Sequence, residues 1–480
     1  MRKIQNNIFS IDPLMTIIFL ILVFIGFISI FSTQIQDDVI FFSFNNEAFK
    51  QLIWIIFSFV ILISIFFLEH RFIYNLAVPL YILSILLLIV VLFVGVEVSA
   101  SKSWFSIFGF RFQPSEFSKS STALLLAKIF DSYNLNLKSL KNLMYVSIVI
   151  ALPSLLILIQ GDFGTALVFS SFFLVFFREG MSLKLVLFIV GIVLIFLLGL
   201  IFDPNILYIV FSVCFLIAIG LSTKNLKNII NFFVIYVFTM IAINGQEVIL
   251  NDVLKPHHKN RIESLINPGA DPLGIGWNIT QSKIAIGSGG FFGKGFLNGT
   301  QTRLDFVPEQ STDFIFSVVG EEFGFVGSLF VILLYSLLLI RIVQLAENQK
   351  DIFARVFGYS IFSVLTFHYM INIAMTLGMF PVIGIPLPFI SYGGSHIVFT
   401  LFSIGVMINI SLNNNYDDTN IYRILNNSIL LHYKKKFKYN GEINYAKIKK
   451  NFSFRRCFLY IDTNICPGCI SINRGSLRFI

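Results

Sequence analysis

The chain has 480 residues, of which 56% are hydrophobic and only 13% charged, and its mean hydropathy is +0.82. This composition excludes a soluble multi-domain protein and is typical of a protein that crosses a membrane many times. The net charge is +9, and twelve Lys and Arg against four Asp and Glu from Leu412 onward account for +8 of it. A basic tail beside anionic lipid explains this excess more simply than nucleic acid binding does.

Runs of about 17–25 apolar residues, long enough to cross a bilayer, recur along the chain. The first follows the basic start MRKIQNN and lacks a small-residue cleavage site, so we expect a retained span rather than a removed signal peptide. We predict about 12 spans, near residues 13–33, 51–69, 73–95, 115–130, 142–159, 163–177, 184–202, 206–222, 228–247, 314–342, 354–376 and 396–412. The predicted fold class is an all-α polytopic membrane protein.

The connections between the spans carry a charge bias that orients the chain. If the N-terminus is cytoplasmic, the connections rich in Lys and Arg fall inside, as the positive-inside rule requires. The connections with Asp37–Asp38, QGDFG and FDPN then fall outside, together with a large loop at about 248–313. We predict a membrane domain over 1–412 with both termini cytoplasmic, and a basic, partly disordered tail over 413–480.

The tail contains one close cysteine pair, Cys466 and Cys469 in CPGC. A thioredoxin-type site needs a βαβ context, and a zinc site needs a fourth ligand that the sequence does not offer. We interpret the pair as incidental and expect no built-in cofactor.

The large outside loop is rich in glycine, with nine in the 31 residues from 269 to 299. Loops of this length are usually functional or disordered, and the Trp, Phe and Ile residues in this one argue against disorder. GSGGFFGKG resembles a phosphate-cradling segment without the spacing of a nucleotide P-loop. Because backbone amides in such a turn can form an anion nest, we expect a phosphate-bearing substrate. The loop also supplies four cations, Arg261, Lys283, Lys294 and Arg303.

Two ionisable residues begin the predicted span at 115–130. Glu116 and Lys119, in QPSEFSK, are three residues apart and therefore share one helix face. They can neutralise each other, or the lysine can bind a lipid phosphate; the sequence leaves both open. Asp162, in QGDFGTA, is interpreted as the cap of the helix that follows it.

Asp313 lies where the glycine-rich loop meets the predicted span at 314–342. Asp313, Ser317, Gly320, Gly324 and Gly327 form one stripe, whose small residues let another helix approach closely. The aspartate is either a helix cap or a base. On one continuous helix, the next two carboxylates would lie about 12–13.5 Å further along, well inside the hydrocarbon. We expect at least one of them to line a hydrated cavity or pair with a cation. They are Glu321 and Glu322.

Five segments resemble the SEDS family (shape, elongation, division and sporulation). They are SWFSIFGFRFQPSEFSK, QGDFGTA, NPGADPLGIGWNITQSKIAIGSGGFFGKGFLNGTQ, LDFVPEQSTDFIFSVVGEEFGFVG and GIPLPFISYGGS. GTQ followed by FVPEQSTDFIFSV favours the RodA-like elongation branch over the FtsW division branch. The resemblance implies a SEDS-type helical bundle, for which the family's usual layout has ten spans.

The resemblance also implies a function. SEDS proteins of this branch are peptidoglycan glycosyltransferases that polymerise lipid II at the outer face of the bacterial cytoplasmic membrane, with a class B penicillin-binding protein. The family's essential aspartate falls on Asp313, and the glutamate and lysine of its QPSE motif fall on Glu116 and Lys119. We predict an inverting transfer in which Asp313 is the general base and undecaprenyl pyrophosphate leaves. The other predicted substrate-binding residues are Trp104, Arg111, Gln113, Arg261, Gln281, Lys294 and Glu322.

The chain departs from the family in three places. Ser103 stands where an arginine often precedes the tryptophan, and His396 replaces the usual second serine after GG. Two additional spans are predicted between about 184 and 247. No metal-ligand spacing is visible, so any Mg or Mn ion would be bound jointly with the substrate.

Two other functions compete with polymerisation. A lipid II flippase could use Glu116, Lys119, Glu321 and Glu322 as a polar path for the headgroup, but no inverted repeat is visible. A non-catalytic scaffold of the cell-wall synthesis complex would not need Asp313.

Overall fold

A computed structural model describes residues 12–34, 43, 46–98, 101–107, 109–133, 135, 137–221, 226–248 and 275–412. The described residues leave out 249–274 of the predicted loop, which include Arg261. They also leave out the tail, residues 413–480, with Cys466 and Cys469. The predictions made for them are therefore not addressed by the structure.

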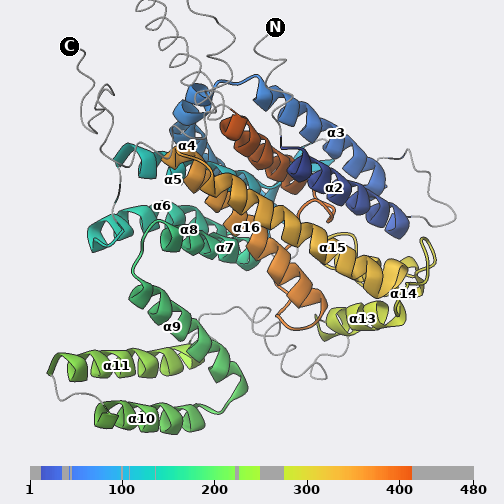
Figure 1. Cartoon of the computed structure of the whole chain (residues 1–480). Helices are drawn as coiled ribbons and strands as arrows, with labels where there is room; N and C mark the ends of the chain where they lie inside the picture. Colours follow the sequence, from blue (N-terminus) through green and yellow to red (C-terminus); the bar gives the residue numbers. More distant parts are fainter. Residues whose placement is uncertain are drawn as a thin grey trace, which may run out of the picture. The chain divides into compact units, whose positions relative to one another are not determined.

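Every predicted span is helical (Figure 1). The helices in chain order are α2 (Pro13–Gln34), α3 (Glu47–Phe66), α4 (His70–Val94), α5 (Pro114–Tyr133), α6 (Leu140–Ile159), α9 (Leu183–Ile201), α10 (Pro204–Leu221), α11 (Leu226–Val248), α15 (Ile315–Glu347), α16 (Ile352–Thr376) and a last helix, Gly394–Leu412. The predicted span at 163–177 consists of α7 (Phe163–Val168), the 3-10 helix η1 (Phe169–Phe172) and α8 (Phe173–Arg178). Nine of the described helices are long and apolar enough to cross a membrane, which confirms an all-α polytopic membrane protein.

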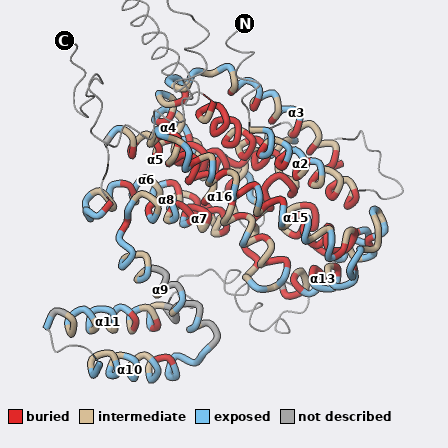
Figure 2. The backbone as a smooth tube through the Cα atoms, viewed as in Figure 1, coloured by how far each residue is buried: buried red, intermediate tan, exposed pale blue. Residues whose placement is uncertain are grey.

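The region of the predicted additional spans forms a helical group of its own. Helices α9 and α10 both pack against α11. Figure 2 shows the residues of α10 and α11 as largely exposed or intermediate, and many of the exposed ones are apolar. In a membrane such side chains would contact lipid.

A small sheet that the sequence did not predict separates α4 from α5. Strands β1 (Val96–Val98), β2 (Ser101–Ile107) and β3 (Phe110–Phe112) pair antiparallel in the order β1-β2-β3. Gly109, with φ of 82°, lies in the turn between β2 and β3, where a left-handed conformation favours glycine. The sheet leads the chain directly into the polar start of α5.

Helix α5 lies in the protein interior, which explains its polar sequence. Its residues from 114 to 124 are all buried (Figure 2), and it packs against both α4 and α16. Hydroxyl groups on α5 bind those of neighbouring helices: Ser121 Oγ is 2.8 Å from Ser84 Oγ, and Ser120 Oγ is 2.8 Å from Ser403 Oγ. Small hydroxylated residues are favoured where membrane helices pack closely.

Helices α2 and α15 contact each other at both ends of α2. Arg341 forms an ion pair with Asp12, and Ser32 Oγ donates to Glu322 Oε1. The twenty residues from Asp12 to Ser32 correspond to about 30 Å of helix, the thickness of the hydrocarbon core. Glu322 therefore lies level with the end of α2, about 30 Å of helix from Asp12. The depth of Glu321 and Glu322 in the hydrocarbon stays a prediction.

The single continuous helix that the sequence suggested is broken just after Glu322, at Gly324, which has φ of 65° and ψ of −157°. The segment after α13, residues 289–299, is called the glycine-rich turn, and it completes the hydrogen bonds on both sides of the break. The amides of Phe325 and Val326 donate to the carbonyls of Gly290 and Phe291, at 2.9 and 3.1 Å. The carbonyls of Glu321 and Glu322 accept from the amides of Lys294 and Gly295, at 3.0 and 2.9 Å.

The predicted loop thus contains regular structure, including α13 (Ile275–Ser288) and the short α14 (Thr300–Arg303). The predicted close approach to the glycine stripe is confirmed, and the approaching element is the end of α13 with its turn. A Cβ added at Gly289 would lie 2.0 Å from the Gly320 carbonyl oxygen. One added at Gly320 would lie 2.9 Å from the side chain of Ile286.

Glu321 binds both the glycine-rich turn and the start of α14. Its fully buried carboxylate accepts the backbone amides of Thr300, Gln301 and Thr302, at 2.8–2.9 Å. It also binds Lys294 Nζ at 2.7 Å, which confirms the predicted pairing with a cation. The anion nest was predicted in GSGGFFGKG, but there the amides of Gly293, Lys294 and Gly295 donate to backbone carbonyls. The amides that surround an anion belong to the start of α14, and the anion is the chain's own carboxylate.

We expect Gly324→Ala to destabilise the protein strongly, because the added Cβ would lie 2.3 Å from the Gly293 nitrogen in a left-handed conformation. The matched control is Gly287→Ala on α13, where an added Cβ meets nothing within 4 Å. The control should be neutral or gain up to about 1 kcal/mol. Thermal unfolding in detergent measures both. Equal midpoints for the two variants would contradict the close approach at the break.

We expect Glu321→Gln to lower the free energy of unfolding by about 3–5 kcal/mol, because it breaks a buried ion pair and removes one of two accepting oxygens. Lys294→Ala is the control, since its side chain is 25% exposed and its loss leaves the three amide bonds in place. Denaturant unfolding of both variants tests this order. A larger loss for Lys294→Ala would show that the cation, not the amides, holds the carboxylate.

Candidate active site

The candidate site is built around a non-helical segment, residues 377–393, that joins α16 to the last helix. Part of this segment is deep in the helical domain: a Cβ added at Gly26 of α2 would lie 2.5 Å from Ile390 Cα. Gly26 is six residues, or about 9 Å, from Ser32 near the end of α2, so this contact is well inside the helix. Irregular backbone beside the middle of a membrane helix is tolerated where protein surrounds it and supplies hydrogen bonds.

Two side chains of α16 supply those bonds, and each also reaches a different part of the site. His368 Nδ1 is 3.0 Å from the Pro386 carbonyl oxygen. Asn372, one helical turn later and fully buried, donates through Nδ2 to the Ile385 carbonyl at 2.7 Å. The same Nδ2 is 2.8 Å from the carbonyl oxygen of Asp313.

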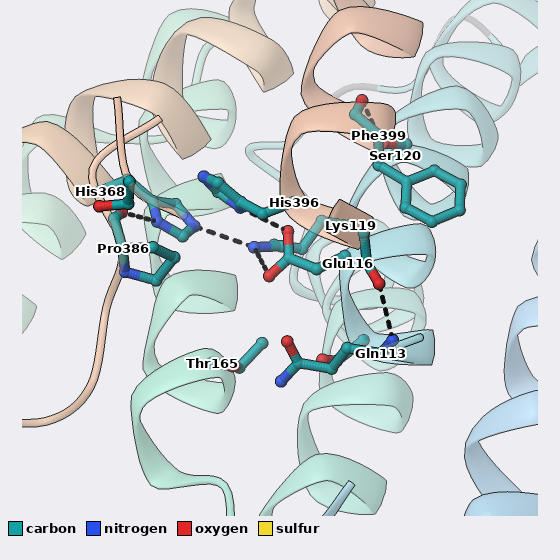
Figure 3. Close-up of polar contacts among 12 residues, drawn as sticks. Gln113, Glu116, Lys119, Ser120, Thr165, His368, Pro386, His396 and Phe399 are labelled. Carbon is teal, nitrogen blue, oxygen red and sulfur yellow. Dashed lines mark hydrogen bonds and ion pairs between the residues drawn. The ribbon is translucent and has the colours of Figure 1, made fainter. Parts of the chain in front are cut away.

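The buried network in Figure 3 confirms that Glu116 and Lys119 form an ion pair, with Lys119 Nζ 2.7 Å from Glu116 Oε1. Two histidines extend the pair. Lys119 Nζ is 2.9 Å from His368 Nε2, and His396 Nδ1 is 2.8 Å from Glu116 Oε2. All four side chains are nearly inaccessible to solvent. The charges of the pair therefore act in a medium that screens them weakly.

The network borders a small open pocket between α5, α16 and the last helix. Its wall combines the four network residues with three hydroxyls and four apolar side chains. The lining residues are Glu116, Lys119, Ser120, Ile361, Val364, Leu365, His368, His396, Phe399, Thr400 and Ser403.

Gln113 connects the network to the turn before α7. Its Nε2 donates to Asp162 Oδ2 at 2.8 Å, and its backbone amide is 2.9 Å from Ser395 Oγ. Asp162 also accepts from the Thr165 amide at 3.0 Å, which confirms it as the cap of α7. Burial raises the pKa of the Asp162 carboxyl, and the hydrogen bonds from Thr165 oppose that rise.

Asp313 lies in a turn one residue before Phe314, which is the N-cap position of α15. The non-helical segment 377–393 fixes this turn. Ser391 Oγ donates to the Thr312 carbonyl at 2.5 Å, and the Tyr392 amide donates to the Ser311 carbonyl at 2.8 Å. This segment and Asn372 thus hold the turn through its backbone.

The carboxylate of Asp313 is partly exposed and lies beside Gly384. A Cβ at Gly384 would be 3.4 Å from Asp313 Oδ2, and φ there is 74°. The neighbouring carbonyl of Ile383 packs on Gly164, where a Cβ would lie only 2.1 Å away. Glycines 164 and 384 thus bring the QGDFGTA and GIPLPFISYGGS motifs together beside Asp313.

Helix α13 lies on the other side of this turn. Ile279 of α13 packs with Phe314 and Val382 in one apolar cluster, and Ser282 Oγ donates to the Thr376 carbonyl at 2.9 Å. Gln281 is therefore on a helix that borders the Asp313 turn, and its own side chain is buried.

Strands β2 and β3 carry the other predicted residues. Arg111 is exposed on β3, and its carbonyl accepts from Ser395 Oγ at 3.4 Å. Burial raises the pKa of nearby Tyr392 to about 12, so its hydroxyl stays protonated. Trp104 is paired with Val96 in the sheet and partly exposed.

Lys294 and Glu322 are engaged elsewhere. Lys294 binds Glu321, while Glu322 Oε1 binds Ser32 and, at 3.1 Å, the Leu297 amide. Neither lines the described pocket. These contacts give both residues a role in holding the glycine-rich turn, and their binding of substrate stays a prediction.

Three contributors were not predicted as site residues. His368 and Asn372 lie on one face of an apolar helix, and their spacing of four residues was the available signal. His396 was noted only as a departure from the family motif. Among the described residues no group of three or more His, Cys, Asp and Glu is placed to hold a metal ion. A cation bound jointly with substrate stays a prediction.

Comparisons with known proteins fit this arrangement. The profile of the cell cycle protein family FTSW_RODA_SPOVE matches residues 12–206 and 192–416. Peptidoglycan glycosyltransferase RodA of Treponema pallidum is 32% identical over 429 residues, covering 85% of this chain and 98% of that protein. Peptidoglycan glycosyltransferase MrdB of Escherichia coli is 34% identical over 332 residues, covering 69% and 76%. Stage V sporulation protein E of Bacillus subtilis is 32% identical, covering 85% and 98%.

Two solved structures share the fold. A chain from a peptidoglycan synthase complex that coordinates polymerization and crosslinking has a TM-score of 0.63 at 27% identity, covering 84% of this chain and 98% of that one. Rod shape determining protein RodA of Thermus thermophilus has a TM-score of 0.55 at 23% identity with the same coverage, and this likeness concerns the fold alone. The profile match and the relatives above 30% identity show that this chain belongs to the FtsW/RodA/SpoVE family, the SEDS family.

Proposed function

We propose that this protein is a peptidoglycan glycosyltransferase that polymerises lipid II at the outer face of the bacterial cytoplasmic membrane, with Asp313 as general base. The observation that carries the proposal is the shared support of Asp313 and the Glu116–Lys119 pair. Both are fixed by one turn of α16 and the segment after it. The family membership and the names of the relatives, peptidoglycan glycosyltransferase RodA and MrdB, support the reaction type.

In the proposed reaction the Asp313 carboxylate accepts the proton of the acceptor sugar's 4-hydroxyl. The oxygen attacks the anomeric carbon of the donor, the bond from that carbon to the pyrophosphate oxygen breaks, and the centre is inverted. Undecaprenyl pyrophosphate leaves with the bonding electron pair. A base at this position needs a carboxylate that substrate can approach, and Gly384 leaves the space beside Oδ2 without a side chain.

Lys119 is the proposed stabiliser of the charge that develops on the pyrophosphate. An ammonium group has three N–H donors, and the contacts to Glu116 and His368 use two of them. A cation held in place before the reaction stabilises developing negative charge without reorganising. The exposed Arg111 on β3 is a second candidate for the same role.

The orientation and the partner belong to this proposal as well. The charge bias of the connections supports cytoplasmic termini, with Asp12–Arg341 near the inner edge and the glycine-rich turn near the outer one. The synthase complex among the similar structures supports a class B penicillin-binding protein as partner. Glu321 and Glu322 are both engaged with the turn, which removes two residues that a flippase path would have used.

We expect Asp313→Asn to reduce lipid II polymerisation by about 10²–10⁴ with unchanged thermal stability, because the turn is held through its backbone. The assay uses the full chain in detergent with its partner, where no leaflets exist for a flippase to connect. The control is Asp203→Asn, which keeps an acceptor for the Asn205 amide before α10 and should retain activity. Undiminished polymerisation by Asp313→Asn would contradict the assignment of the base. If neither the wild type nor the variants form glycan, a flippase or a scaffold is favoured.

We expect Asn372→Asp to inactivate the enzyme although the two side chains have the same shape. The change replaces the Nδ2 donor by an acceptor that faces the carbonyls of Asp313 and Ile385. Buried acceptors left without a donor cost about 1–3 kcal/mol each. Polymerisation and the unfolding midpoint should therefore both fall. Full activity at the normal midpoint would show that Asn372 does not position the Asp313 turn.

A further inference from the structure

His396 is the buried titratable group of the candidate site whose second ring nitrogen has no protein partner. Its side chain is 6% exposed, and Nδ1 binds Glu116 Oε2 at 2.8 Å. Nε2 is buried and finds no hydrogen-bond partner in the part of the chain that the structure describes. Because His396 lines the pocket, whatever fills the pocket can meet this nitrogen.

The neighbours of the two histidines fix where their protons are. The carbonyl of Pro386 can only accept, so His368 carries its proton on Nδ1 and accepts from Lys119 through Nε2. The ionised Glu116 carboxylate likewise only accepts, so Nδ1 of His396 is the donor to it. Only Nε2 of His396 can then gain or lose a proton without breaking a bond of the network.

His396 also determines the position of the ion pair. It supplies the donor to Glu116 Oε2, while Lys119 binds Oε1. Without that donor one oxygen of a buried carboxylate would be unsatisfied, and the carboxylate could rotate away from Lys119. Fixing Glu116 thus fixes the direction in which the Lys119 ammonium faces the pocket.

We propose that His396 is a positioning residue of the glycosyl-transfer site, which fixes Glu116 through Nδ1 and sets the charge presented to the lipid-linked pyrophosphate through Nε2. This inference rests on the proposed function. The other charged or titratable groups around it are Glu116 and Lys119 on α5, His368 on α16 and Asp162 before α7. A proton on Nε2 changes Glu116, Lys119 and His396 together from neutral to +1. Pyrophosphate binding should therefore tighten as pH falls.

Two substitutions separate the roles of the two ring nitrogens. His396→Asn places an amide nitrogen where Nδ1 is and has nothing at Nε2. His396→Gln places its amide near Nε2 and leaves Glu116 Oε2 without its donor. The control is His70→Asn, a histidine that pairs with Asp351 at the other end of α16.

The measurement is KM and kcat for lipid II with the full chain and its partner, from about pH 5.5 to 8.5. For the wild type and His70→Asn, KM should fall as pH falls. For His396→Asn that extra dependence should disappear while kcat stays within about threefold, since the donor to Glu116 is kept. For His396→Gln, kcat should fall about tenfold or more, with a lower unfolding midpoint than His396→Asn. A wild-type pH dependence in His396→Asn, or equal losses in both variants, would overturn the proposal.

A second readout keeps this inference distinct from the proposed function. If the wild type and its partner form no glycan, the proposed function fails, and thermal stabilisation by undecaprenyl pyrophosphate is measured over the same pH range. Stabilisation that grows toward low pH in the wild type and not in His396→Asn supports the role of Nε2. Identical stabilisation of the two proteins refutes it.

Discussion

One turn of α16 holds the candidate site together. His368 and Asn372 lie four residues apart on a helix that is otherwise largely apolar, and each binds a carbonyl of the non-helical segment before the last helix. The same two side chains reach outward in different directions, His368 to Lys119 and Asn372 to the backbone of Asp313. A buried polar group is costly unless it is hydrogen-bonded. The two residues therefore specify one arrangement of α5, α15 and the segment between α16 and the last helix.

That segment is unusual for its place in a membrane protein. It has no regular structure, and Phe389 within it adopts a left-handed conformation with φ of 66°, which is uncommon for a bulky residue. Backbone strain of this kind persists where the surroundings over-determine it, and it clusters at functional sites. Here the surroundings are the ring of Phe19, the close approach at Gly26 and the hydroxyl of Ser391. The result is a fixed support for the Asp313 turn.

The glycine-rich turn has a structural role, although its composition suggested a site for a phosphate. Its amides at 293–295 donate to backbone carbonyls, and the amides that gather around a negative charge are those of α14, which bind the side chain of Glu321. Its glycines allow its backbone to enter the break in α15 and complete the hydrogen bonds of both halves. The turn therefore completes the hydrogen bonding of a broken helix.

The sequence by itself determined the helical spans, the shared helix face of Glu116 and Lys119, the capping role of Asp162 and the family. These depend on features that repeat locally or stand in long motifs: apolar run length, a spacing of three residues, a carboxylate before a helix start. Only the tertiary structure decided the break in α15, the partners of Glu321 and Glu322, and the contacts of His368, Asn372 and His396. The apolar pattern predicted one continuous helix over 314–342, and a single glycine at position 324 breaks it. The other decisions depend on contacts between residues far apart in the chain, such as Asn372 with Asp313 and His396 with Glu116, and no local pattern encodes which distant donor meets which acceptor.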